Sequence, residues 1–188
     1  MTDAFHKFPH TPHLLWLGEG TPREDKILSS SEARAFLDGT VIVEEKVDGA
    51  NLGLSVGPDG RVRAQSRGNY LAPGRCHAQW SPLWLLLAQR EGALAQALGS
   101  ELMLFGEWAY ALHTIAYTRL PAWFLAFDVY EPASGRFWSV TKRNALVGKL
   151  RIETVPEVFR GRLALNHVAG LIGPSHIGAP RMEGLYLR

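Results

Sequence analysis

The sequence has a single cysteine, Cys76, among its 188 residues. One thiol cannot form an intrachain disulfide or supply a cysteine-based zinc cluster, so both devices for stabilising a small domain are excluded. A chain without disulfides is typical of a reducing compartment, and we therefore expect a cytoplasmic protein.

The sequence also lacks a large excess of charge of either sign. It has 20 Lys and Arg residues and 18 Asp and Glu residues, for a formal net charge of +2. This excludes a protein that coats nucleic acid through bulk positive charge, although it leaves room for a local basic groove. Lysine is scarce as well. The lysines of the chain are Lys7, Lys26, Lys46, Lys142 and Lys149.

Long hydrophobic runs are absent from the sequence. Residues 1–13 lack the apolar stretch of a signal peptide, and the longest strongly apolar run, residues 83–88, is far too short to span a bilayer. We therefore expect no membrane partner. Hydrophobic residues still make up 46% of the chain and charged residues 20%, which is enough apolar material for the core of one ordinary domain.

Turn and cap residues divide the chain into strands and helices. The Pro-Asp-Gly sequence at residues 58–60 predicts a hairpin turn, the sequence at residues 29–32 predicts a capped helix, and Ser81 is expected to cap the next one. We expect an extended arm over residues 1–26 and helices over residues 33–37, 81–98, 141–150 and 162–172. We expect strands over residues 41–47, 51–56, 61–66, 102–108, 123–130, 136–140, 154–158 and 184–188.

Strands joined by hairpins are antiparallel, so the predicted fold class is α+β, with mainly antiparallel sheets flanked by helices. A stripe of apolar side chains on the second helix has helical spacing and predicts core packing rather than a platform for stacking bases. Its members are Trp80, Leu83, Trp84 and Leu87.

The end of the first predicted strand holds the most informative residues. Side chains alternate along a strand, so Lys46 and Asp48 should point to the same side, just before Gly49. A lysine attacks as a nucleophile only after losing its proton, which burial or a neighbouring cation favours and a carboxylate opposes. A bound divalent metal or an arginine could restore the balance. The alternative is an edge strand with a surface ion pair.

Further chemical groups follow the predicted strands in order along the chain. Each has an ordinary structural explanation alone, as a surface charge or a core aromatic. Together they supply what a nucleotide-phosphate site needs: arginine binds phosphate, carboxylates bind ribose hydroxyls or Mg²⁺, and an aromatic ring stacks on a base. These groups are Arg67, Glu107, Phe127 and Glu183.

In this order the sequence resembles the covalent nucleotidyltransferase superfamily of ATP-dependent RNA ligases, DNA ligases and mRNA capping enzymes. Asn51 and the segment at residues 110–115 are more similar to the RNA ligase branch, as is the lead-in at residues 11–14 and 25–28. The motifs that carry the resemblance are Lys46-Val47-Asp48-Gly49 (motif I), Ser66-Arg67, Phe105-Gly106-Glu107 (motif III), Phe127-Asp128 (motif IIIa) and Glu183-Gly184-Leu185 (motif IV).

The resemblance implies one nucleotidyltransferase (ATP-grasp-like) domain over residues 1–188, with ATP and Mg²⁺ or Mn²⁺ as cofactors. Lys46 would attack the α-phosphorus of ATP to form a covalent lysyl-AMP. The AMP would pass to the 5′-phosphate of an RNA end, and a 3′-hydroxyl would then expel it. The implied partners are RNA ends, nicked or single-stranded, and possibly DNA.

The resemblance also implies roles for the surrounding residues. Glu45 would present backbone groups to the adenine edge, and Phe127 would stack on the adenine ring. Glu107 would hold the ribose, and Arg67 would hold phosphate or ribose. The other implied nucleotide-binding residues are Asp48, Gly49, Asn51 and Glu183, and the implied metal ligands are Glu183 and Asp48.

The sequence departs from the family pattern at its end. Family members carry a motif V strand with paired lysines after motif IV, whereas this sequence ends at Arg188. We expect either a truncated form or a short protein with impaired self-adenylylation, without a C-terminal domain. A DNA ligase, a GTP-using capping-type enzyme and a nucleotide- or RNA-binding module with impaired turnover stay open as alternatives.

Overall fold

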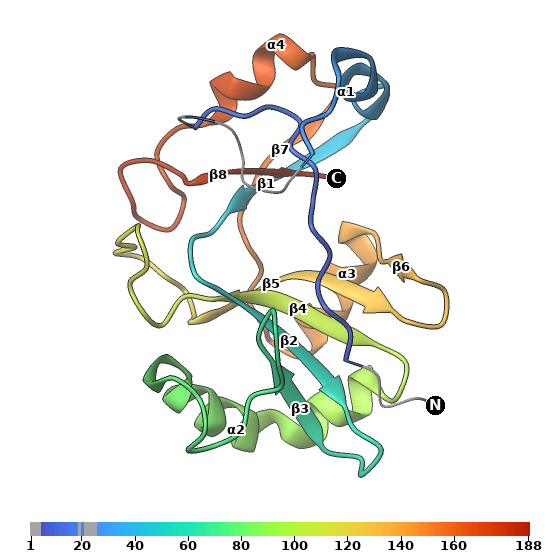
Figure 1. Cartoon of the computed structure of the whole chain (residues 1–188), viewed down its shortest axis with the longest axis vertical. Helices are drawn as coiled ribbons and strands as arrows, with labels where there is room; N and C mark the ends of the chain where they lie inside the picture. The colour runs from blue at the N-terminus through green and yellow to red at the C-terminus, as the bar shows by residue number, and fades with distance from the viewer. Residues whose placement is uncertain (1–4, 19, 21–25) are drawn as a thin grey trace. The chain divides into compact units, whose positions relative to one another are not determined.

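The computed structural model describes residues 5–18, 20 and 26–188. The chain divides into two compact units by its contacts. The first consists of Met1–Phe8 and Val47–Val155, and the second of Pro9–Lys46 and Pro156–Arg188. One boundary therefore falls directly after Lys46. Figure 1 labels the helices and strands of both units.

The first unit is built on a five-stranded antiparallel sheet with the strand order β3-β2-β4-β5-β6. Strands that follow one another in the sequence, such as β2 and β3, pair as hairpins, as the turn residues predict. In the β2–β3 turn Gly60 adopts a φ of 75°, a conformation that favours glycine. The strands are β2 (Ala50–Val56), β3 (Val62–Gln65), β4 (Met103–Trp108), β5 (Phe124–Glu131) and β6 (Arg136–Phe137).

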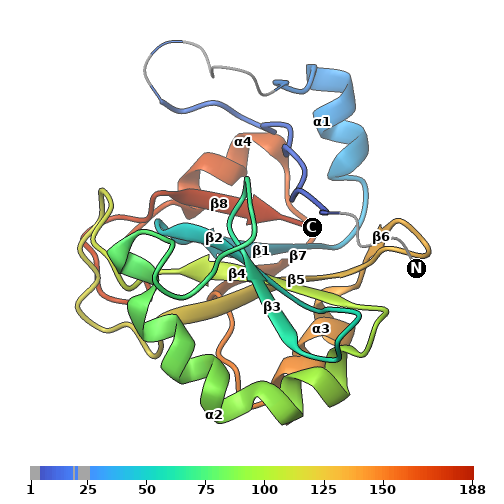
Figure 2. The ribbon, with the colours of Figure 1, turned by 60° about the horizontal axis from the view of Figure 1, so that its bottom comes forward.

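Two helices, α2 (Ser81–Leu98) and α3 (Val140–Lys149), cover one face of this sheet, as Figure 2 shows. A 3-10 turn, Ala78–Trp80, precedes α2. The core forms where the helices meet the sheet, and its fully buried members include Leu52, Leu83, Leu94, Leu104 and Val147. Because side chains alternate along a strand, the strand residues next to these leucines lie on the opposite face.

The N-terminal residues of this unit cover part of that opposite face. The Gln65 side chain donates a hydrogen bond to the His6 carbonyl at 2.7 Å, and the Phe8 ring packs edge-on to Phe105 with 5.0 Å between centroids. The His6 ring stacks on Tyr130 at 4.0 Å. Burial lowers the pKa of His6 from its ordinary value, so this ring stays neutral at pH 7.

The second unit is built on a three-stranded antiparallel sheet with the order β7-β1-β8. Its strands are β1 (Val41–Lys46), β7 (Glu157–Gly161) and β8 (Gly184–Leu187). Helices α1 (Ser30–Phe36) and α4 (Leu165–Val168), the latter continued by a 3-10 turn at Ala169–Leu171, belong to the same unit. A small core holds it together, with Leu37, Val41, Val43, Leu163 and Val168 buried.

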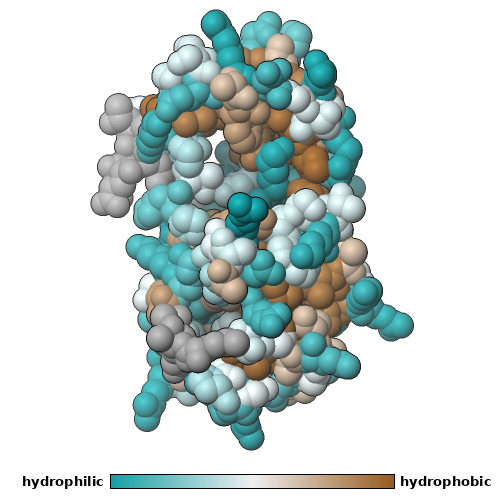
Figure 3. Space-filling model, turned by 90° about the vertical axis from the view of Figure 1, so that its right-hand side faces the viewer, coloured by the Kyte–Doolittle hydropathy of each residue, from teal (hydrophilic) through white to brown (hydrophobic). Residues whose placement is uncertain are grey.

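The predicted α+β class with mainly antiparallel sheets and flanking helices is confirmed. Of the extended arm predicted over residues 1–26, residues 1–4, 19 and 21–25 lie outside the described part. In the described remainder of the arm, the structure shows a single bridge, from His13 to Ile27. None of the described helices has the length and hydrophobicity that crossing a lipid bilayer requires. On the face shown in Figure 3, hydrophilic side chains project, with smaller hydrophobic areas between them.

Helix α2 has the predicted bounds, but the residue at its N-cap differs from the prediction. Ser81 does not cap it, because the preceding 3-10 turn runs directly into the helix and makes Trp80 the N-cap residue. Trp80, Leu83 and Leu87 are buried in the core, as their spacing predicts. Trp84, in contrast, is only partly buried and packs against the rim of that core.

The strand predicted over residues 136–140 is too long, because β6 stops at Phe137. The residues that follow belong to a helix start. The Ser139 hydroxyl accepts a hydrogen bond from the Lys142 amide at 3.3 Å and so caps α3, which begins at Val140. A strong N-cap thus competes with strand extension and prevails.

Two further boundaries are corrected near the chain end. The strand predicted over residues 154–158 starts only at Glu157, because Pro156 has no N–H for a sheet ladder, and Thr154 makes a single parallel bridge to Ala126. The helix predicted over residues 162–172 shrinks to α4 and a 3-10 turn. Its N-cap has no side-chain hydrogen bond, and Gly170 disfavours continuation.

The N-terminal cap of α1 should make the stability of this helix depend on pH. Glu32 accepts a hydrogen bond from Lys26 at 2.5 Å and another from the Ser29 amide at 2.8 Å, and these bonds, led by that from Lys26, lower the pKa of Glu32 to about 2. Because the folded value lies below the ordinary 4.5, the carboxylate stabilises α1 above about pH 4.5 and loses this effect as the pH falls toward 2.

We expect Glu32→Gln to lower the thermal unfolding midpoint at pH 7, and this loss should shrink progressively below pH 4.5. Glu153→Gln, at another exposed carboxylate, serves as the control and should show no such trend. An equal loss at pH 7 and pH 3 for Glu32→Gln would contradict the argument.

Candidate active site

The nucleophile predicted from the sequence, Lys46, is the last residue of β1 and pairs with Gly184, the first residue of β8. This register sets Glu183 beside it, and the Lys46 ammonium donates a hydrogen bond to Glu183 Oε1. The side chains of Lys46 and Glu183 are 49% and 34% exposed. Motifs I and IV, which are 137 residues apart at these two positions, therefore meet at one end of the small sheet, within reach of solvent.

Glu45, one residue before the lysine, is buried within the second unit. Its carboxylate accepts hydrogen bonds from the Ser175 hydroxyl at 2.5 Å and the His176 amide at 3.0 Å. It thereby fastens the loop that leads to Glu183 onto β1. The Glu45 amide donates to the Pro156 carbonyl at 2.9 Å, so this backbone group is engaged within the unit.

Asp48 begins the other half of motif I, in the first unit. Its Oδ2 accepts hydrogen bonds from the backbone amides of Thr114 at 2.6 Å and Ile115 at 2.8 Å. The Asp48 amide donates to the Tyr117 hydroxyl at 2.8 Å. Asp48 thus ties the loop between β4 and β5, which contains the RNA ligase-like segment at residues 110–115, to the start of β2.

Gly49 and Asn51 meet the end of β4. A Cβ at Gly49 would lie 2.7 Å from the Trp108 carbonyl oxygen and 3.0 Å from Cγ of Glu107, so only glycine fits without displacing the backbone. Asn51 stands directly opposite Glu107 in the β2–β4 ladder. The Oδ1 atom of Asn51 is buried and has no hydrogen-bond partner among the described residues. An amide and a carboxylate side by side can bind ribose hydroxyls.

Phe127 lies farther along β5 at a β-bulge. Phe105 pairs with Asp128 and Gly106 with Ala126, so Phe127 is the extra residue between them. Its half-buried ring packs edge-on to Phe8, 5.3 Å away. A bulge re-aims side chains and is often found beside functional sites.

Arg67 is exposed in the turn after β3. This turn is closed by the Ser66 amide, which donates to the Asn69 carbonyl at 2.9 Å. The arginine is therefore carried by a defined turn, and its head group is open to solvent.

The structure thus groups the predicted site residues within each unit. Glu45, Lys46 and Glu183 lie together in the second unit. In the first unit, Gly49, Asn51 and Glu107 lie where β2 meets β4, and Asp48 precedes them. Phe127 lies two residues beyond the β5 partner of Glu107.

Several supporting residues escaped the sequence analysis. Ser175 and Tyr117 carried no signal in the sequence, because their partners are far away in the chain.

Arg143, in contrast, carried a signal that the sequence analysis could have detected. It shares the buried stripe of α3 with Val140 and Val147, and a charge on an apolar stripe needs a partner. Its guanidinium donates to the Phe127 carbonyl at 2.5 Å, which supports the bulge from the helix side.

The described residues contain no group of three or more His, Cys, Asp and Glu side chains that could hold a metal ion alone. In phosphoryl transfer, Mg²⁺ and Mn²⁺ are usually bound by one or two carboxylates together with the substrate phosphates. The Glu183 carboxylate is accessible and lies beside Lys46, so it has the chemistry to bind an ion in that way.

The family model described as RNA ligase matches residues 39–188. No curated protein matches the chain.

Among solved structures, a mutant of the Naegleria gruberi RNA ligase with ATP and Mn is similar at a TM-score of 0.61 and 20% identity, over 82% of this chain and 48% of that one. An apo mutant of the RNA ligase R4a of the same organism has a TM-score of 0.59 and 20% identity, over 80% and 46%. A third, with AMP and Mn, has a TM-score of 0.60 at 18% identity, over 82% and 48%. The chain thus spans about half the length of the structures it matches, and the likeness confirms the predicted nucleotidyltransferase-like fold.

Proposed function

We propose that this chain, which belongs to the RNA ligase family, is the self-adenylylating part of an ATP-dependent RNA ligase. The observation that carries the proposal is the contact between Lys46 and Glu183. An accessible lysine at a strand end, next to an accessible carboxylate, supplies a nucleophile and a ligand for the phosphate-bound cation. The residues of the first unit supply groups for the nucleoside.

In the first step, Nζ of Lys46 forms a bond to the α-phosphorus of ATP while the bond from that phosphorus to the pyrophosphate oxygen breaks. Pyrophosphate leaves, the amine proton passes to water, which reaches the half-exposed side chain, and Lys46 carries AMP as a phosphoramidate. Glu183 has the carboxylate chemistry that Mg²⁺ or Mn²⁺ prefers, and the bound ion would neutralise charge on the phosphates.

The nucleoside is held by residues of the first unit. The buried, unpartnered Oδ1 of Asn51 accepts a hydrogen bond from a ribose hydroxyl, and Glu107, opposite it in the ladder, holds the same sugar. Phe127 stacks on the adenine, and Arg67 binds a phosphate. Solved RNA ligase structures that contain ATP with Mn or AMP with Mn support this choice of nucleotide and metal.

In the later steps AMP moves from Lys46 to the 5′-phosphate of an RNA end, and a 3′-hydroxyl attacks that phosphate and releases AMP. Asp48 contributes by positioning the loop at residues 110–115, since its carboxylate already accepts two backbone hydrogen bonds from that loop.

The experiment is incubation of the purified chain with Mg²⁺ or Mn²⁺ and α-³²P-labelled ATP, GTP or NAD, followed by denaturation in SDS. We expect covalent label on the protein from ATP alone, and this label should be stable in alkali and released by hot acid, as is characteristic of a phosphoramidate. Label from GTP would indicate a capping-type enzyme, and tight ATP binding without any label would indicate a binding module. Joining of a nicked RNA duplex but not of a nicked DNA duplex would then establish the substrate.

A further inference from the structure

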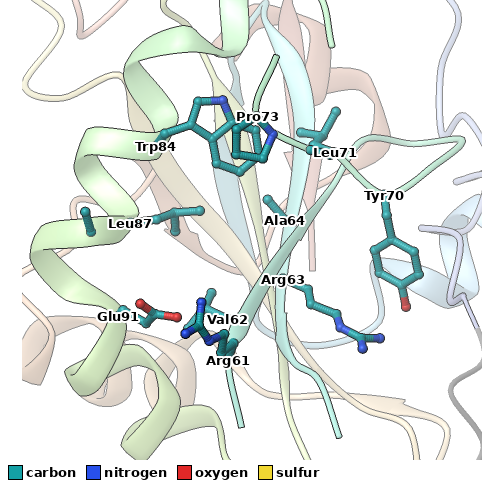
Figure 4. A pocket seen from close by; sticks show the side chains of 12 residues that line it. Arg61, Val62, Arg63, Ala64, Tyr70, Leu71, Pro73, Trp84, Leu87 and Glu91 are labelled. Carbon is teal, nitrogen blue, oxygen red and sulfur yellow. The ribbon is translucent and has the colours of Figure 1, made fainter. Parts of the chain in front are cut away.

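A groove lies along the edge strand β3, on the side where the first turns of α2 pass it. Its cavity volume is about 560 Å³. Figure 4 shows α2 along one side and β3 along the other, with Trp84 and Pro73 at one end and Arg61 and Glu91 at the other. The lining has an apolar floor that includes Val62, Ala64 and Leu87.

Two aromatic side chains belong to the lining of this groove, on opposite sides of β3: in Figure 4 Trp84 lies on the α2 side, and Tyr70 lies with Arg63 on the other side. The α2 residues Trp84, Leu87 and Glu91 lie on one helix face, and Trp84 is the member of the apolar stripe that the core leaves partly uncovered. Tyr70 is 37% exposed, and the Arg63 guanidinium lies 5.8 Å from its ring centroid. Accessible aromatic rings bind unpaired bases by stacking, whatever their sequence.

Positive charge exceeds negative charge around the groove. Residues 60–90 contain five arginines and no Asp or Glu, in a chain whose net charge is only +2. Arg90 is engaged by the carbonyls of Leu150 and Arg151, to which it donates at 2.6 and 3.0 Å. Arg61 and Arg63 belong to the lining of the groove, whereas Arg67 and Arg75 do not. Among the described lining residues, Glu91 is the one acid.

We propose that this groove binds a single-stranded segment of the RNA substrate. The RNA strand crosses the edge of β3, so that unpaired bases stack on Trp84 on one side and on Tyr70 on the other, and the phosphates contact Arg61 and Arg63. Arginine charge alone would also suit an acidic peptide, but arginines interleaved with accessible aromatic rings favour a polymer that alternates flat bases with phosphates. The assignment of RNA as this polymer rests on the proposed function, whereas the groove itself does not.

The test is fluorescence anisotropy of a labelled single-stranded RNA 12-mer with a 5′-hydroxyl, without ATP, at several salt concentrations. This RNA cannot accept AMP at its 5′ end, so binding is separated from chemistry. The variants are Arg61→Gln/Arg63→Gln and Trp84→Leu. The matched control is Arg136→Gln/Lys149→Gln, which removes the same charge from exposed positions elsewhere in the first unit.

We expect the groove double variant to weaken binding at least tenfold and to reduce the slope of log K against log salt by about 1 to 2. Trp84→Leu should weaken binding at least fivefold with little change in that slope, because stacking is not ionic. The control should change affinity less than the groove double variant.

Equal weakening by the groove and control variants, or no RNA binding by the parent chain, would overturn the proposal. If Trp84→Leu fails to fold, the surface arginine variant still decides the question. A parent chain that binds RNA through the groove but takes no label from ATP would overturn the proposed enzymatic function and leave this inference standing.

Discussion

Replacement of Lys46 by alanine should abolish the covalent AMP label, because no other atom of the chain is proposed to bond to the α-phosphorus. Lys46→Arg should be equally inactive, since a guanidinium keeps its proton and cannot act as the nucleophile. Gel analysis of denatured protein after incubation with α-³²P-labelled ATP measures the result.

Two controls separate chemistry from folding. The ion pair of Lys46 with Glu183 is half exposed, and such pairs contribute at most about 1 kcal/mol, so Lys46→Ala should leave the thermal unfolding midpoint almost unchanged. Lys149→Ala, at an exposed lysine at the end of α3, should keep full label. Undiminished label in folded Lys46→Ala protein would refute the assignment of the nucleophile.

Replacement of Asp48 by alanine should release the loop between β4 and β5. The Asp48 carboxylate accepts hydrogen bonds from the amides of Thr114 and Ile115 at 2.6 and 2.8 Å. The alanine variant removes this charged acceptor from both N–H groups. Hydrogen bonds to charged groups contribute about 1.5–3 kcal/mol each, and partial rehydration of the loop reduces the loss, so we expect about 2 kcal/mol. We also expect at least tenfold slower formation of the label.

Hydrogen exchange gives the sharpest measurement of this loop. The amides of Thr114 and Ile115 should lose their protection in Asp48→Ala. They should retain part of it in Asp48→Asn, because asparagine keeps an acceptor oxygen. Asp59→Ala is the matched control. Asp59 accepts a single bond, from the Arg61 amide at 3.2 Å in an exposed turn, and its loss should leave both amides and the label unaffected. Unchanged protection in Asp48→Ala would mean that other contacts hold the loop.

Local signals in the sequence predict much of the fold. Helix α2 begins and ends where predicted, because Pro82 favours the first turn and Gly99 ends the helix with a φ of 54°. The capping box of α1 and the β2–β3 turn follow from a few adjacent residues each. One misplaced boundary arose where two local preferences competed, at Ser139, where a helix cap closely follows a strand.

The sequence by itself determined the family and the order of the chemical groups, since a lysine, carboxylates, an arginine and an aromatic at strand ends are readable without any fold. Only the tertiary structure decided which of them meet. The register of β1 with β8 brings Glu183 to Lys46, and the loop after β4 returns to Asp48. The tertiary structure also decided that Glu45 is a buried anchor and that Gly49 must lack a side chain. Strand register and long-range hydrogen bonds join residues more than sixty positions apart, and local propensity carries no information about such pairs.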